Sequence, residues 1–466
     1  MRAGFNLEHC CSLQRLARTL AVICEGNGRH LVLWAVFLLI HSCCLAAASV
    51  SADQPLTSKI EGSCFGPIRF QVTVGQVLTA DEQRSLASAV QIRLDEINRK
   101  MSTYTPDSDI TRFNRESSTE WFPVDLETAR VVELAQRISE KSEGAFDVTV
   151  GPLVAAWKFG AANPDGEEDH QIPSAAEIKQ LLDRVGYAKL EVRLDPPALR
   201  KQVANLELDL SAVAKGYAVD EVANVVAGLG YESYFVEVGE EVRAAGRHPA
   251  GRTWVCGIEK PLELEREIEL KVPLENLAIA TSGDYRQFRM VEDRRYSHTI
   301  DPRTGYPTDG QVALASIATS ECSVADAWAT AAMVLGVEKM LELSEQHRLG
   351  LHMVTRDAQG QLTSRQNARY PKPIVEPQVA GPNWVVMVGA TVLVFGLALA
   401  GMSVGVMFKR KPISGSCGGL ANMPNQDNRS PCELCSNPSQ ECRELGRGAK
   451  AAREAREAAE AAEHRH

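Results

Sequence analysis

The stretch of the chain from Trp384 to Phe408 carries no charged residue and is built almost wholly of apolar side chains and glycine. A helix of roughly 20 such residues crosses the hydrocarbon core of a bilayer, so this stretch is long enough to span a membrane. A buried core helix is the alternative, but the length and the approach through Pro371, Pro373 and Pro377 disfavour it. We therefore predict a single transmembrane helix over residues 384–408.

The charges that flank this span indicate its orientation. Lys409, Arg410 and Lys411 follow it directly, and an excess of basic residues is typical of a cytoplasmic flank. Arg369 and Lys372 on the other side weaken the asymmetry without reversing it. We expect the C-terminus in the cytoplasm and the long region before the span on the outer side.

The first 48 residues have the features of an export signal. Arginines precede an apolar run from Leu31 to Leu45, and Ala46–Ala48 offers the small residues that signal peptidase requires. Ile40–Cys43 loosely resembles a lipoprotein cleavage site, although His41 is atypical there. We expect residues 1–48 to be a signal peptide or an uncleaved anchor of a bacterial cytoplasmic (inner) membrane, with a periplasmic domain after it.

The net charge and the placement of the cysteines disfavour a nucleic-acid-binding protein and a disulfide-stabilised fold. The net charge is −10 and no basic block stands in the middle of the chain, which disfavours a nucleic-acid partner. Of twelve cysteines, only Cys64, Cys256 and Cys322 fall in the central region, so buried thiols are a better expectation there than a disulfide framework.

The region between the two apolar segments mixes strands and helices. Ile68–Val74 alternates as a half-buried strand does, and a helix should follow, opened by the capping box of Thr79 and Glu82. Its apolar positions recur at helical spacing at Leu86, Val90, Leu94, Ile97 and Met101. Later strands and helices repeat this mixture, so the fold class is α+β.

Two clusters of polar residues look suited to binding an anionic ligand. Asp209 ends a predicted strand, and Lys215 lies one turn into the helix that follows, where helix N-termini hold anions. The loop Ser297–Pro307 contains His298 next to Asp301, and the histidine is a candidate proton acceptor. A simple helix cap and a structural turn remain the alternatives for the two clusters.

Two further clusters suggest a cation and a flavin. Asp326 and Thr330 are four residues apart on a predicted helix, so both oxygens project from one face, as a hard cation such as Mg²⁺ requires. Phe146 and Asp147 join a helix end to a strand, where the ring could contact a flavin. A solvated helix pair and a core phenylalanine beside a turn are the alternatives.

In combination these segments resemble the ApbE family of FAD:protein FMN transferases, over most of the span from Gly62 to about Arg369. The resemblance is carried by Met101–Tyr104 with Pro106–Ser108 and Phe113–Asn114, by Gly144–Asp147, Trp157–Gly160, Asp209–Gly216, Ala280–Tyr285, the His298 loop and the Asp326/Thr330 helix. This resemblance implies that an FAD site is lined by Tyr104, Ala145, Phe146, Asp147, Asp209, Lys215 and Ile300. It implies that Mg²⁺ is held by the Ala212 carbonyl, Asp326 and Thr330.

The chain departs from the family at two turns. Phe65-Gly66-Pro67 replaces the usual Met-Gly-Thr, so Phe65 would take the place of a methionine in the FAD site. Gly239-Glu240-Glu241 replaces a paired glycine.

The resemblance also implies the reaction. FMN would pass from FAD to a Thr or Ser hydroxyl of an acceptor flavoprotein, with release of AMP. Either His298 or Asp284 could accept the proton of that hydroxyl. A protein that binds or hydrolyses FAD without an acceptor is the alternative, and a purely structural metal carrier is a third.

Four cysteines, Cys417, Cys432, Cys435 and Cys442, lie close together after the predicted span, and reduced thiolates in this number can hold iron or zinc. With the span, this region resembles NqrM, a maturation factor of the Na⁺-translocating NADH:quinone reductase that is thought to supply iron. That complex also carries covalent FMN, so both modules would serve one partner. The predicted domains are 1–48, a catalytic domain at 60–370, a linker at 371–383, the span at 384–408, a Cys-rich module at 409–445 and a charged tail at 446–466.

Overall fold

The computed structural model describes residues 56–159, 172–262, 267–285, 288–291 and 294–374, together with a few helical residues between Val388 and Gly396. The chain divides into two units, Met1–Val375 and Glu376–His466. No helix among the described residues is long and apolar enough to span a bilayer. The predicted leader, the Cys-rich module, the charged tail and most of the predicted span lie outside the described residues.

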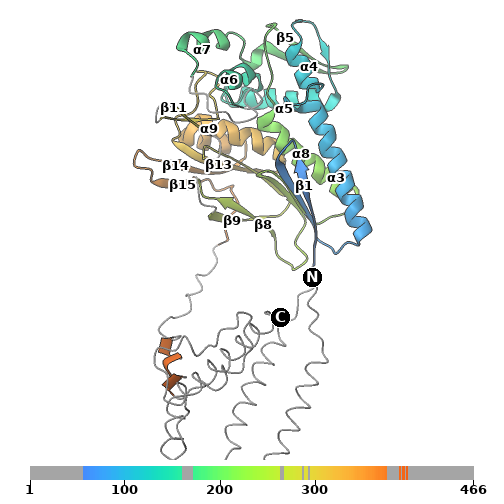
Figure 1. Cartoon of the computed structure of the whole chain (residues 1–466), viewed down its shortest axis with the longest axis vertical. Coiled ribbons are helices and arrows are strands. Elements are labelled where there is room, and N and C mark those ends of the chain that lie inside the picture. The colour runs from blue at the N-terminus through green and yellow to red at the C-terminus, as the bar shows by residue number, and fades with distance from the viewer. Residues whose placement is uncertain are drawn as a thin grey trace, which may run out of the picture. The chain divides into compact units, whose positions relative to one another are not determined.

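The first unit is built on one large sheet (Figure 1). Its eight strands run in the order β1-β2-β6-β7-β10-β13-β14-β15, and each pairs with its neighbours in antiparallel fashion. The strands are β1 (Ser58–Cys64), β2 (Ile68–Val74), β6 (Tyr234–Val238), β7 (Glu241–Ala245), β10 (Leu277–Gly283), β13 (Val312–Thr319), β14 (Gly350–Arg356) and β15 (Leu362–Gln366).

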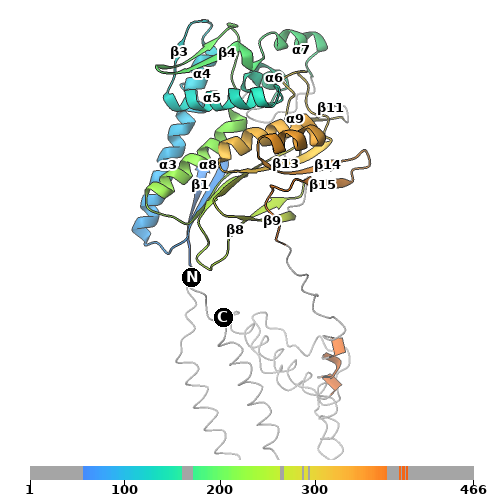
Figure 2. The ribbon, with the colours of Figure 1, turned by 180° about the vertical axis from the view of Figure 1, so that it is seen from behind.

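Three long helices, α3 (Ala80–Met101), α8 (Ser211–Gly228) and α9 (Cys322–Gln346), cover one face of this sheet, as Figure 2 shows from behind. The capping box of Thr79 and Glu82 is present at the start of α3, and all five of its predicted apolar positions are buried. The main hydrophobic core lies between these helices and the sheet. The predicted α+β class and this helix are therefore confirmed.

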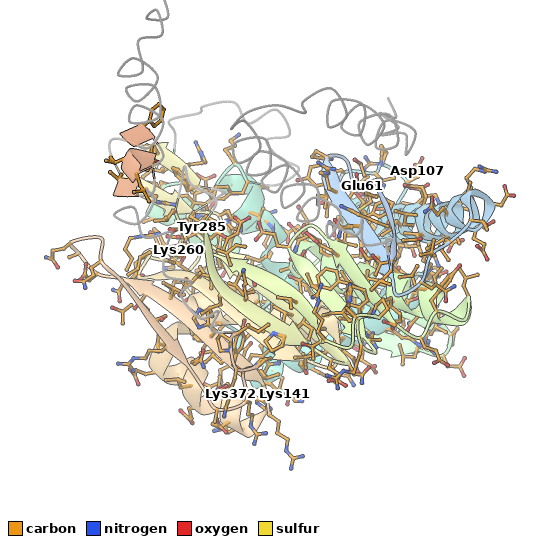
Figure 3. All side chains as sticks on the ribbon, turned by 90° about the horizontal axis from the view of Figure 1, so that it is seen from below. Glu61, Asp107, Lys141, Lys260, Tyr285 and Lys372 are labelled. Atoms are coloured by element: carbon orange, nitrogen blue, oxygen red, sulfur yellow. The ribbon has the colours of Figure 1, made fainter. Side chains whose placement is uncertain are left out.

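The opposite face of the sheet is covered by a hairpin of β8 (Trp254–Glu259) and β9 (Ile268–Leu274), which Figure 3 views from below. Trp254 and Cys256 on this hairpin pack with Tyr285, which the figure labels, in a second hydrophobic cluster. Cys64, Cys256 and Cys322 are buried free thiols, as predicted.

A smaller layer lies above the helices in Figure 1. It contains α4 (Asp109–Arg115), α5 (Leu126–Lys141), η1 (Val148–Val150), α6 (Gly151–Ala156), α7 (Ala175–Leu182), η3 (Tyr187–Lys189), and a sheet of β3 (Phe122–Pro123), β5 (Pro197–Lys201) and β4 (Leu190–Leu194). A two-stranded sheet of β11 (Phe288–Val291) and β12 (Arg294–Ser297) leads into the His298 loop. The Phe146/Asp147 cluster lies in this layer, whereas Lys215, Asp326 and Thr330 lie on the helices that cover the large sheet.

Candidate functional site

Lys215 forms the centre of a buried charge cluster between α8, α9 and the start of β7. Its Nζ forms an ion pair with Glu241 and lies 3.4 Å from Oδ1 of Asp326. Burial disfavours its charge, but the two carboxylates outweigh this and raise the pKa of Lys215. Burial raises the pKa of Glu241 to about 7 in spite of the lysine. Lys215 is therefore a half-buried lysine held by two buried carboxylates.

Gly216 lets α8 and α9 approach closely enough to form this cluster. A Cβ at this position would lie 2.7 Å from the carbonyl carbon of Cys322 and 2.8 Å from Cβ of Asp326. The Gly216 N–H donates to Oδ2 of Asp326 at 3.0 Å. Only a residue without a side chain permits this approach, so glycine fixes the distance between Lys215 and the α9 carboxylate.

Asp220, one turn further along α8, caps the beginning of α9. Its carboxylate accepts hydrogen bonds from the N–H groups of Cys322 and Ser323, each at 2.9 Å, and from the Ser323 hydroxyl. Arg243 of β7 donates to the same carboxylate at 2.7 Å. The α9 N-terminus has no side-chain cap of its own, so a neighbouring helix satisfies its backbone donors. This fixes the register of Asp326 relative to α8.

The predicted magnesium ligands meet at the same place. Asp326 is only 2% exposed, and the Thr330 hydroxyl on the same face of α9 lies 3.5 Å from the Ser282 hydroxyl of β10. Ala212 lies one turn before Gly216 in α8. In a regular helix the Gly216 N–H donates only to the Ala212 carbonyl, but here it also donates to Asp326. These are hard oxygen donors beside excess buried negative charge, which fits Mg²⁺. The described residues hold no cluster of three or more His, Cys, Asp or Glu side chains arranged as a metal site.

Asp209 links the start of α8 to Val148, which follows the Ala145–Asp147 segment. Its carboxylate accepts from the Ser211 N–H at 2.8 Å, as a helix cap does, and its own N–H donates to the Val148 carbonyl at 2.8 Å. Burial and the nearby Asp209 carboxylate raise the pKa of Tyr104, whose side chain is otherwise largely exposed. That Tyr104 and Asp209 line one FAD site stays a prediction.

The segment from Ala145 to Asp147 is more deeply buried than a flavin contact requires. The Phe146 ring belongs to the main core at 2% exposure. The Asp147 carboxylate accepts from the Thr149 N–H at 2.8 Å and the Tyr187 N–H at 2.6 Å, and burial raises the pKa of Asp147 against these bonds. The structure thus makes Phe146 a core residue and Asp147 a turn cap. The FAD contacts of this segment stay a prediction.

The His298 loop folds onto this segment. Ile300 is buried and forms an isolated bridge with Pro307, and the Trp157 indole donates to the Gly305 carbonyl at 2.9 Å. The Arg303 side chain packs 3.7 Å from where a Cβ on Gly144 would lie. His298 itself is partly buried. The loop is therefore held by specific contacts rather than exposed throughout.

Asp284, the other candidate proton acceptor, is fully buried at the end of β10. Its Oδ2 accepts from Nη1 of Arg356 at 2.8 Å, and its backbone carbonyl accepts from Arg295 at 2.6 Å. The carboxylate is thus already engaged in an ion pair.

One of the two turns that depart from the family, that at Gly239, borders the charge cluster. The β6–β7 hairpin has a two-residue loop whose first residue, Gly239, has φ +68°, whereas Glu240 is not among the residues with positive φ. A tight turn of this kind needs glycine only at its first position, so Glu240 is accommodated. Phe65 has φ +49° in the β1–β2 turn and packs against the main core. The Gly239 N–H donates to the Arg69 carbonyl at 2.8 Å, which ties the β6–β7 turn to β2.

Two residues of the site, Glu241 and Asp220, were not predicted from the sequence. Glu241 stands directly after a glycine turn, and Asp220 is one acid among several on a helix. No local pattern distinguishes either of them, because each acquires its partners from distant segments.

Comparisons with known proteins identify the families that the chain resembles. A model of the ApbE family matches residues 68–355, and a model described as (Na⁺)-NQR maturation NqrM matches residues 406–457, outside the described residues. The FAD:protein FMN transferase of Vibrio cholerae is 37% identical over 279 residues, which cover 60% of this chain and 82% of that protein. That of Salmonella typhimurium is 34% identical over 334 residues, covering 71% and 93%.

Solved structures show the same fold. The flavin transferase ApbE from Vibrio cholerae has a TM-score of 0.61 at 34% identity and covers 67% of this chain and 97% of that one. The apo form of the Pseudomonas stutzeri flavinyl transferase ApbE has a TM-score of 0.59 at 33% identity, covering 67% and 95%. Since the family model spans more than half of the chain and the relatives are matched over most of their length, the chain belongs to the ApbE family.

Proposed function

We propose that the chain is an FAD:protein FMN transferase that uses Mg²⁺ to move FMN onto a Thr or Ser hydroxyl of an acceptor flavoprotein. The supporting observation is the cluster of Lys215, Asp326 and Thr330, where a lysine and hard oxygen donors meet at the contact of α8 with α9. The names of the curated relatives supply the reaction class.

In this reaction the acceptor oxygen forms a bond to the FMN phosphorus, the pyrophosphate P–O bond breaks, and AMP leaves. A divalent cation, when bound, neutralises charge on the phosphates. Lys215 stays protonated because Asp326 and Glu241 raise its pKa, so it can donate to a phosphate oxygen. Asp209 at the start of α8 and the exposed Tyr104 would orient the nucleotide. We favour His298 as the acceptor of the hydroxyl proton, because the Asp284 carboxylate is engaged by Arg356.

The experiment incubates the purified full-length chain with FAD, Mg²⁺ and a candidate acceptor domain, and measures the acceptor mass. An increase equal to FMN, lost on removal of Mg²⁺ and in Asp326→Ala, would support the proposal. Glu338→Ala is the matched control, because it removes an acid from the same helix at an exposed position. FAD cleavage that leaves the acceptor unlabelled would instead support the hydrolase alternative.

We further propose that the C-terminal region acts on the same client, the Na⁺-translocating NADH:quinone reductase, and helps to deliver iron to it from the cytoplasmic side of the inner membrane. The match of residues 406–457 to the NqrM model supports this. The full-length chain, purified from membranes without oxygen, should carry iron that the double variant Cys432→Ser, Cys435→Ser lacks, while its FMN transfer is unchanged. Equal iron in both proteins would refute the metal site.

A further inference from the structure

A cavity of about 550 Å³ lies beside the His298 loop. Its wall is formed by Asp284 at the end of β10, Arg295 and Ser297 of β12, Thr308, and Arg356 with Ala358 at the turn between β14 and β15. Figure 1 shows the β14–β15 hairpin projecting from the edge of the sheet. None of the predicted FAD-site residues is among the described residues that line this cavity.

The cavity is connected directly to the predicted site of chemistry. Ser297 in its wall precedes His298 in the chain. Across the loop, the Thr308 N–H donates to the Thr299 carbonyl at 2.9 Å, so both sides of His298 are joined to the wall. A molecule bound in the cavity would therefore contact residues on both sides of the segment that carries this histidine.

The wall is polar and fixed in position. Arg356 donates to the Asp284 carboxylate at 2.8 Å, and Arg295 donates to the Asp284 carbonyl at 2.6 Å, so both guanidinium groups are held by one residue. The Thr308 hydroxyl is buried and, among the described residues, has no hydrogen-bond partner. An apolar ligand would leave such groups without partners at a cost in free energy.

A polypeptide segment suits this wall, because its backbone offers a donor and an acceptor at every residue. The volume lies in the range of roughly 300–1,000 Å³ that is typical of ligand sites. We infer that this cavity receives the segment of the acceptor polypeptide that presents the hydroxyl to be flavinylated. This inference rests on the proposed transfer of FMN to a protein.

A bulky residue at the rim tests the inference. Ala358 and Gln359 are adjacent and exposed in the same turn, but only Ala358 lines the cavity. In the full-length chain, Ala358→Trp should raise the KM for the acceptor domain at least tenfold and leave the Kd for FAD, measured by flavin fluorescence, unchanged. Gln359→Trp is the matched control and should change neither value.

A milder variant guards against misfolding of the turn. Thr308→Val keeps the shape of the side chain and removes its hydroxyl, so the KM for the acceptor should rise between about twofold and tenfold, the effect of one hydrogen bond. An unchanged acceptor KM in both Ala358→Trp and Thr308→Val would overturn the inference. A weakened Kd for FAD would also overturn it, because the cavity would then belong to the FAD site. Failure of the unmodified chain to label any acceptor would instead refute the proposed function.

Discussion

Replacement of Gly216 by alanine tests the close contact of α8 with α9 on which the site depends. Helix propensity alone favours the change, since alanine in a helix interior is about 1 kcal/mol better than glycine. The structure predicts the opposite sign. The added methyl group would lie 2.7 Å from the carbonyl carbon of Cys322 and 2.8 Å from Cβ of Asp326, distances that are too short for carbon atoms.

The magnitude follows from these two opposing effects. Neither neighbour is the end of a flexible side chain, so the helices themselves must separate, and we take the upper part of the range of about 1–3 kcal/mol found for overpacked cores. After the gain in helix propensity, a net loss of about 1–2 kcal/mol remains. For a domain of this size, that corresponds to a fall of roughly 2–8 °C in Tm.

Gly228 supplies the control, because it lies in the same helix and a Cβ there would meet no atom within 4 Å. Gly228→Ala should therefore be neutral or stabilise by up to about 1 kcal/mol. Urea unfolding or calorimetry measures both variants, and FAD titration should show weaker binding only for Gly216→Ala. If the two variants stabilise the chain equally, the close contact is wrong.

Three other predictions concern buried charges. Lys201 is 1% exposed and donates to the carbonyls of Phe113, Glu116 and Leu206, so Lys201→Met should cost about 3 kcal/mol in urea unfolding by leaving acceptors unsatisfied. Asp220→Asn loses an ion pair and a cap of α9, and should lower the free energy of unfolding by about 2–4 kcal/mol while Arg243→Met costs less. Burial raises the pKa of Glu241 from 4.5 to about 7. Between these two pH values the metal-free native state holds a proton that the unfolded chain has released, so the stability from this group is lost as the pH rises from about 4.5 to about 7. Glu241→Gln should flatten that part of the curve of Tm against pH; an identical slope in both proteins would contradict the assignment.

Local sequence signals account well for the helices. The capping box before α3 and the apolar spacing within α3 involve residues within a few positions of one another, so both can be recognised without knowledge of the fold. The helix that begins at Cys322 leaves helical geometry at Gly336, which has φ +75°. A second helical piece then continues to Gln346, because its apolar face still packs against the core.

Non-local pairing explains what the sequence did not reveal. The strand order of the large sheet places β10 next to β7, and the β8–β9 hairpin covers its far face, although no residue pattern specifies either arrangement. In the site, Lys215 meets Glu241 across 26 positions and Asp326 across 111. The position of Lys215 at a helix start predicted an anion site, but its ion pair with Glu241 depends on residues that are distant in the sequence.

The charge balance of this cluster bears on how the ligands bind. One lysine faces two buried carboxylates, and burial raises the pKa of Glu241, as expected where negative charge is in excess. A divalent cation would remove this excess, and the phosphates of FAD would then offset the added positive charge. Each ligand thus improves the electrostatic environment of the other, and reciprocal coupling of two binding equilibria follows by thermodynamic linkage. Mg²⁺ should therefore tighten FAD binding in the unmodified chain. This coupling should weaken in Asp326→Asn, where one of the buried negative charges is removed. An FAD affinity that does not depend on Mg²⁺ in the unmodified chain would refute the coupling.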